Sequence, residues 1–266
     1  MRAFLDDTAQ IIGPVFSFDK APEGRSERET AIARFVLDKA KTIYEAAEKL
    51  GGVESMNLPE CFLQHVVYLK KYSRIEEGGE IRKGNGTEGI PEEERKLREA
   101  IVAFGNRLVE ENLVQGTWGN ISARLNEKEM LVTPSGVDYD HIEPGDIMKV
   151  EIATLQYAPN GNLKPTSEKN LHGAVYASRP DVGAIVHTHS TYCSVYAAAE
   201  QDHPMAKLAD YGIPGSRKLA ENTASALGSG IGAIMAHHGM IAVGADLEAA
   251  FSNAVLLEDT AKSALV

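Results

Sequence analysis

The chain has 266 residues, of which 43% are hydrophobic, and a formal net charge of −11. This length is sufficient to bury a sizeable core in one domain of ordinary size, with a smaller appendage. The acidic balance, together with the lack of any basic run longer than two residues, argues against contact with a nucleic-acid backbone. We therefore expect no nucleic acid among its partners.

The sequence has no apolar stretch of the length needed to span a bilayer, and its first residues lack the apolar core of a signal peptide. Its two cysteines, Cys61 and Cys193, lie in unrelated segments without a metal-binding or disulfide pattern. Such cysteine usage is typical of a reducing compartment. We expect a cytoplasmic protein that does not bind membranes.

The first third of the chain is predicted to be a small helical module, residues 1–75. Apolar residues recur there at helical spacing and stop at Gly51 and Gly52, a suitable C-terminal cap. Residues 76–90 contain five glycines and few apolar side chains, which is typical of a linker. Residues 91–266 then form the main domain. The apolar positions of the first helix are Ile32, Val36, Ala40, Ile43, Ala47 and Leu50.

Strands and helices alternate through the main domain. Pro91, followed by three glutamates, favours a helix start, because a missing amide and negative charge both suit a first turn. The alternation that follows predicts an α/β fold built on one sheet. Strands are expected at residues 120–125, 130–133, 147–152, 183–189 and 233–243, and helices at 167–178, 191–200, 216–228 and 246–264.

The most informative pattern is the pair His187 and His189 at the end of an apolar strand, followed by His237 and His238 in a second apolar stretch. Alternate residues of a strand point to the same face, so His187 and His189 can bind one ion. A third imidazole completes a set with one open position, as in catalytic divalent-metal sites. The spacing does not choose between His237 and His238. We assign no role to His65, His141 or His203.

Five motifs occur in order along the main domain: Gly116-Thr-Trp-Gly-Asn-Ile-Ser122, Val132-Thr-Pro-Ser-Gly136, Pro165-Thr-Ser-Glu168, His187-Thr-His189 and His237-His-Gly239. In these motifs the chain resembles the class II aldolase/adducin family, from about residue 94 to the C-terminus. The resemblance implies a three-layer αβα fold with a central, mostly antiparallel sheet. The segment before residue 90 resembles nothing recognisable.

The resemblance also implies a metal set and an assembly. The family's third ligand is the histidine directly before the glycine, which makes the set His187, His189 and His238. Zinc suits three imidazoles best, and manganese, cobalt or iron are the alternatives. Members of the family form rings of four, so a homotetramer is expected.

Three turns around the metal motifs have the composition of an anion site. Glycines in residues 116–120 leave backbone amides accessible, residues 135–136 form a Ser-Gly turn, and residues 166–167 place hydroxyls at a helix start. Each has an ordinary alternative, namely a tight connection or a helix N-cap. The resemblance implies that these turns bind a substrate phosphate, through Thr117, Asn120, Ser135, Gly136, Thr166 and Ser167.

Glu168 directly follows the hydroxyl pair. One interpretation of this residue is a solvent-facing glutamate that the helix dipole favours. The resemblance instead implies a general acid/base, since aldolases of the family have glutamate at this place and the epimerases have aspartate. His172 lies one helical turn later, on the same face, and is expected to support the site without binding the metal itself.

These residues and the resemblance together imply a metal-dependent aldolase that cleaves a ketose 1-phosphate to dihydroxyacetone phosphate and an aldehyde through a metal-stabilised enediolate. A dehydratase or epimerase acting on a similar phosphorylated ketose is the alternative, and a non-catalytic, adducin-like interaction protein is a third. Residues 201–211 form a shorter loop than in the resembled aldolases. The N-terminal module is therefore expected to cover the site or to mediate assembly.

Overall fold

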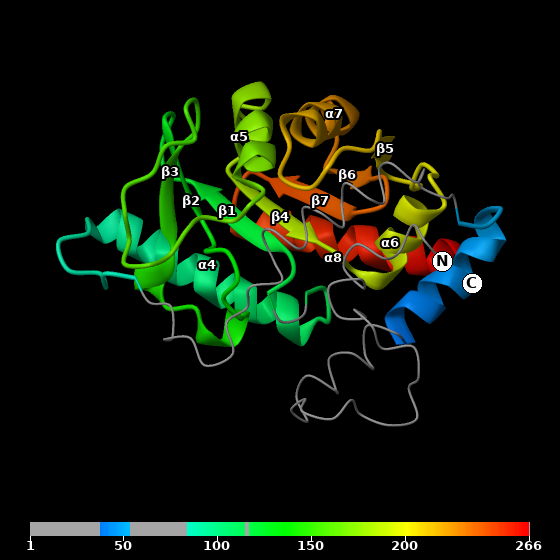
Figure 1. The fold of residues 1–266 in the computed structure, drawn as a ribbon, viewed down its shortest axis with the longest axis horizontal. Helices are drawn as coiled ribbons and strands as arrows, with labels where there is room; N and C mark the ends of the chain where they lie inside the picture. The colour runs from blue at the N-terminus through cyan, green and yellow to red at the C-terminus, as the bar shows by residue number, and fades with distance from the viewer. Residues whose placement is uncertain (1–37, 54–83, 115–116, 266) are drawn as a thin grey trace.

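The computed structural model describes residues 38–53, 84–114 and 117–265, and its centre is one seven-stranded sheet (Figure 1). The strand order is β3-β2-β1-β4-β7-β6-β5. All neighbours are antiparallel except β5 and β6, which are parallel. The strands are β1 (Asn120–Arg124), β2 (Glu129–Val132), β3 (Met148–Glu151), β4 (Ala184–Thr188), β5 (Lys207–Ala209), β6 (Gly232–Met235) and β7 (Gly239–Gly244).

Helices cover both faces of the sheet, which confirms the predicted three-layer αβα fold (Figure 1). Each face has its own hydrophobic core: Val186 of β4 packs on the side of α4, α6 and α8, and Ile185 on the side of α5 and α7. Burial on both faces explains why the first three residues of β4, Ala184 to Val186, are all apolar. The helices are α4 (Glu92–Glu110), α5 (Lys169–Ser178), α6 (Thr191–Ala198), α7 (Arg217–Leu227) and α8 (Leu247–Ala264), with 3₁₀ turns η1 (Glu48–Leu50), η2 (Tyr139–His141) and η3 (Pro144–Asp146).

The prediction of one strand over residues 233–243 is wrong. The chain reverses at residues 236–238, so β6 and β7 are antiparallel neighbours and the histidine dyad lies in their turn. His237 has φ 56°, a left-handed conformation that a tight reversal needs and that an apolar pattern does not reveal. No pattern in the sequence predicted β5, a strand of three residues.

The described part of the N-terminal segment packs onto the main domain. Residues 38–47 are helical and continue into η1, and Ile43 and Ala47 belong to the same core as α8. The Lys49 ammonium donates to the Leu265 carbonyl, and the Gly84 amide donates to Asp146 Oδ1 over 2.6 Å. The division into residues 1–75, 76–90 and 91–266 stays a prediction, because residues 1–37 and 54–83 lie outside the described part.

Within residues 38–53, 84–114 and 117–265, no helix has both the length and the apolar character required to cross a bilayer.

Candidate metal centre and active site

Three imidazoles meet at one end of the sheet. His187 is the fourth residue of β4, His189 follows that strand directly, and His238 ends the turn before β7. Their ring centroids are 4.8, 5.0 and 4.9 Å apart, close to an equilateral triangle. Gly239 makes this approach possible, because a Cβ at that position would lie 2.4 Å from the Thr188 carbonyl oxygen and 3.1 Å from the His189 ring.

The hydrogen bonds of His187 show that its Nε2 is ready to bind a cation. Nδ1 lies 2.8 Å from the Met240 carbonyl oxygen, which only accepts, so Nδ1 carries a proton and Nε2 is the nitrogen that can take up a further proton or a metal ion. Glu168 Oε2 lies 2.9 Å from this Nε2. Two acceptors at that distance repel each other unless a proton or a metal ion lies between them.

The nitrogen spacing fits a metal as well. His187 Nε2 and His189 Nε2 are 2.9 Å apart. A tetrahedral zinc with Zn–N bonds of about 2.0–2.1 Å separates its ligand nitrogens by about 3.3 Å, so only a small adjustment is required. Ligand atoms of His187, His189 and His238 all lie within 4.8 Å of one another. The structure therefore brings together the three residues predicted as ligands.

The structure also distinguishes the two residues of the dyad. His238 points to the site, with Nε2 3.1 Å from Glu168 Oε1. His237 points elsewhere, with Nε2 2.6 Å from Glu200 Oε1 and its ring 6.0 Å from that of Tyr211. Geometry thus favours His238 as the third ligand and gives His237 a place in the turn.

Glu168 is the N-cap residue of α5 and is only 5% exposed, so the alternative of a solvent-facing glutamate is excluded. Burial by itself would raise its pKa, but the charges of His187 and His238 and their hydrogen bonds together outweigh burial and hold the pKa well below its usual range. The carboxylate is therefore ionised and lies against two of the three predicted ligands.

The turns predicted to bind phosphate converge around Glu168. Residues 134 and 165 form a bridge, the Thr166 amide donates to the Thr133 carbonyl over 3.1 Å, and the Ile121 amide donates to Thr133 Oγ1 over 3.2 Å. Thr166 is buried, and its Oγ1 accepts from the Glu168 amide over 3.3 Å. Thr117 and Gly136 are exposed, and Ser135 and Ser167 are half-buried. A phosphate site stays a prediction.

Asn120 is the exception among those residues, because its side chain contacts Glu168 directly. Its Nδ2 donates to Glu168 Oε2 over 3.0 Å, and its Oδ1 contacts His172 Nε2. His172 Nδ1 in turn lies 2.6 Å from Ser122 Oγ, and Ser122 Oγ lies 2.9 Å from the Tyr176 hydroxyl. The predicted support from His172 is therefore confirmed as a contact, and it runs through Asn120.

Sequence reasoning missed Ser122 and Tyr176, although both had a signal. Ser122 is two residues after Asn120 and so on the same face of β1, and Tyr176 is four residues after His172 and so on the same face of α5. Both are buried. The available indication in the sequence was a second polar residue on the same face of the element, two residues later in the strand and four residues later in the helix.

Lys39 is a further residue that the sequence did not single out. Its ammonium donates to the backbone carbonyl of His189 and lies 5.9 Å from the centroid of the Trp118 ring. Trp118 belongs to the turn before β1, where a Cβ on Gly119 would lie 2.6 Å from the His187 carbonyl oxygen. The helix of residues 38–47 therefore contacts the main domain beside His187 and His189, two of the predicted ligands.

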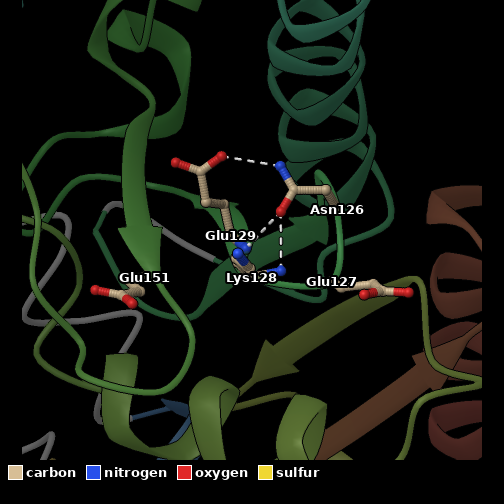
Figure 2. Close-up of a pocket in the computed structure, with 5 residues that line it drawn as sticks. All are labelled: Asn126, Glu127, Lys128, Glu129 and Glu151. Atoms are coloured by element: carbon tan, nitrogen blue, oxygen red, sulfur yellow. Dashed lines mark hydrogen bonds between the residues drawn. The ribbon is translucent and has the colours of Figure 1, made fainter.

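A surface crevice lies away from these residues, at the hairpin between β1 and β2 (Figure 2). Figure 2 shows the Asn126 side chain bound to the Glu129 carboxylate and to the backbone amides of residues 128 and 129. The crevice contains none of the predicted site residues. Its lining is Asn126, Glu127, Lys128, Glu129 and Glu151.

The chain is similar to several known proteins. Residues 99–265 match the family model described as the class II aldolase and adducin N-terminal domain. A 5-methylthioribulose-1-phosphate/5-deoxyribulose-1-phosphate aldolase of Rhodospirillum rubrum is 33% identical over 62% of this chain and 79% of its own. A 3-oxo-tetronate 4-phosphate decarboxylase of Haemophilus influenzae is 29% identical over 62% of this chain and 85% of its own.

A solved L-fuculose 1-phosphate aldolase superposes with a TM-score of 0.60 at 32% identity, covering 63% of this chain and 84% of that one. The L-fuculose phosphate aldolase of Escherichia coli K12 is 31% identical over 59% of this chain and 77% of its own. The family model spans more than half of the chain and the folds agree. The protein is thus a member of the class II aldolase and adducin family, and it is a lyase of the aldolase type.

Proposed function

We propose that the protein cleaves a phosphorylated ketose, in the first instance a ketose 1-phosphate, to dihydroxyacetone phosphate and an aldehyde. The observation that carries this proposal is the position of Glu168, an ionised and buried carboxylate within 2.9–3.1 Å of Nε2 atoms of two predicted ligands. A base fixed beside a metal site suits proton transfer at a carbon next to a carbonyl.

His187, His189 and His238 would hold the metal through their Nε2 atoms, and zinc suits three imidazoles, with manganese, cobalt or iron as alternatives. A bound divalent ion supplies positive charge that stabilises negative charge developing on the substrate oxygens. The carbonyl of Met240 fixes His187 in the tautomer that binds metal, which is a support common to histidine ligands.

Glu168 would move the proton. When the C3–C4 bond breaks, its electron pair stays with the C3 fragment, and the C4 hydroxyl loses a proton as that carbon becomes an aldehyde. Glu168 begins ionised, so it can accept the proton that the C4 hydroxyl loses. It can then deliver a proton to C3, which releases dihydroxyacetone phosphate. Glu168 thus takes up one proton and releases one in each turnover.

Neutral donors would hold the phosphate, which reconciles an anionic substrate with a net charge of −11. Backbone amides and hydroxyls act at hydrogen-bond distance, whereas the opposing charge of the surface is screened within about 8–10 Å at physiological salt. Asn120 has a second Nδ2 hydrogen that remains for this purpose. The proposed donors are Thr117, Asn120, Ser135, Gly136, Thr166 and Ser167.

Product analysis tests the reaction. Metal-loaded protein incubated with a panel of ketose 1-phosphates should release dihydroxyacetone phosphate, detected by coupled reduction, together with an equimolar aldehyde. Water loss or inversion without a three-carbon fragment would replace the aldolase by a dehydratase or epimerase. Because one relative is named a decarboxylase, carbon dioxide release from a phosphorylated 3-oxo acid is the matching assay for that alternative.

Assembly is a separate proposal. Family members form rings of four with sites at subunit contacts, and we propose a homotetramer for this chain. Light scattering of the metal-loaded protein should give four times 28.7 kDa. An active monomer would exclude this assembly.

Lys39 is expected to support the metal site. Its ammonium fixes the His189 carbonyl at the end of β4, so Lys39→Met should keep the packing of the side-chain stem while weakening zinc binding by about tenfold, in the range typical of outer-shell partners. Competition with a chromophoric chelator measures this affinity. Lys41→Met is the matched control, because Lys41 is exposed and pairs only loosely, at 3.8 Å, with Glu45. Equal zinc affinities for the two variants would contradict the prediction.

A further inference from the structure

A buried row of polar groups runs from α5 through β1 to the carboxylate of Glu168. The Tyr176 hydroxyl lies 2.9 Å from Ser122 Oγ, which lies 2.6 Å from His172 Nδ1. His172 Nε2 contacts Asn120 Oδ1, and Asn120 Nδ2 lies 3.0 Å from Glu168 Oε2. Every one of these side chains is buried. Because these groups are buried, the hydroxyl and ring hydrogens of the row must be donated within it.

The direction of each hydrogen bond follows from chemistry, starting at the carboxylate. Asn120 Nδ2 donates to Glu168 Oε2, so its Oδ1 faces His172. Oδ1 also only accepts, so His172 must donate from Nε2. A neutral imidazole that donates from Nε2 accepts at Nδ1, so Ser122 donates to His172. Ser122 Oγ then accepts from the Tyr176 hydroxyl.

Both aromatic groups are in the required protonation states. Burial lowers the pKa of His172 to about 3, so the ring is neutral throughout the physiological range and bears one hydrogen. Burial likewise raises the pKa of Tyr176, which keeps its hydroxyl hydrogen. All donors in the row consequently point toward Glu168.

We propose that Tyr176, Ser122, His172 and Asn120 form a one-way hydrogen-bond chain that orients the Glu168 carboxylate, and that Asn120 and His172 are positioning residues for the general base. The inference rests on the proposed function only in calling Glu168 the base. The aligned donors place partial positive charge at Oε2. Oε1, which does not receive this donor, is the oxygen left to carry the transferred proton.

The tautomer of His172 is the observable that tests the chain without any substrate. Solid-state ¹⁵N NMR of metal-loaded protein labelled at histidine should show a His172 ring protonated at Nε2 and unprotonated at Nδ1, assigned by the signal that His172→Gln removes. Ser122→Ala withdraws the donor to Nδ1 but leaves the Asn120 acceptor at Nε2, so the ring should stay protonated at Nε2 while its Nδ1 signal shifts with the loss of that hydrogen bond. A wild-type ring protonated at Nδ1 would overturn the proposal.

Kinetics then separate positioning from simple structural support. His172→Leu should lower kcat about tenfold or more, leave KM within about twofold and retain the metal, because substrate contacts persist while the base is misoriented. His172→Gln restores a donor near the Nε2 position and should recover most of kcat. The matched control is His203→Leu, which removes another buried histidine, bonded to the Leu257 carbonyl at 3.0 Å, and should leave kcat unchanged.

The outcomes distinguish this proposal from the function on which it rests. A kcat loss in His203→Leu equal to that in His172→Leu, or no rescue by glutamine, would overturn the positioning role even in an active aldolase. An Nε2-protonated His172 in a protein that cleaves no ketose phosphate would support the chain and overturn the proposed reaction.

Discussion

Turnover of the Glu168→Gln variant should fall about a hundredfold or more, with the metal retained, because general acid/base catalysis has that usual magnitude. Glutamine has the shape of glutamate, and its carbonyl can accept from Asn120 Nδ2 as Oε2 does in the wild type. The variant therefore keeps the site assembled and removes only the base. Steady-state kinetics on the substrate found by product analysis, with metal content measured on the same sample, are the required measurements.

Glu200→Gln is the matched control for this experiment. Glu200 also contacts a histidine at 2.6 Å, but that histidine is His237, which points away from the three predicted ligands. The same chemical change should leave turnover close to that of the wild type. Unchanged turnover in Glu168→Gln would assign the proton transfer to another group.

The second large effect is expected from removal of a metal ligand. Purified protein should hold about one divalent ion per chain, and His187→Ala should lose most of it together with activity, because two imidazoles leave an incomplete site. His187 also lies directly against Glu168, so the loss should exceed that from any residue acting indirectly. Elemental analysis by mass spectrometry after dialysis checks the metal content.

The histidine dyad offers an internal control for the ligand assignment. His238→Ala should lose the metal as His187→Ala does, whereas His237→Ala should keep it and lose only the contact with Glu200. Metal loss from His237→Ala with retention in His238→Ala would reverse the assignment. Full occupancy in the double variant of His187 and His189 would remove the site altogether.

The sequence predicted most of the helices and strands, because burial patterns are local, whereas the three layers came from the family resemblance. The first residues of β4, which is packed on both faces, are all apolar, and the helices begin and end near polar residues or glycines. It failed at the reversal between β6 and β7. Residues 233–243 are apolar on both sides of the turn, and the left-handed backbone of His237 has no signature of its own. Backbone conformation, and not hydrophobicity, determines where the chain reverses between these two strands.

The candidate site shows the same limit. His187 and His189 were predicted from residue type and spacing, whereas the choice of His238 over His237 and the role of Glu168 came from the family resemblance. Asn120 was predicted to hold phosphate, yet its amide faces Glu168 and His172, since the pairing of β1 with β4 sets Asn120 opposite His187. Lys39 lies 150 residues from His189 in sequence and could not be placed beside it from the chain alone. Contacts between strands can be predicted only when the register of the strand pairing is known.

The strand order gives the three ligands unequal local stability. His187 belongs to β4, the central strand, whose amides are expected to exchange with solvent only when the whole domain unfolds. His238 ends a reversal, where opening involves a few residues, and His189 lies just beyond its strand. Dissociation of a bound ion would therefore begin at the reversal, through fraying of one turn, while β4 stays paired. Metal exchange and global unfolding are thus separate events with separate rates in this fold.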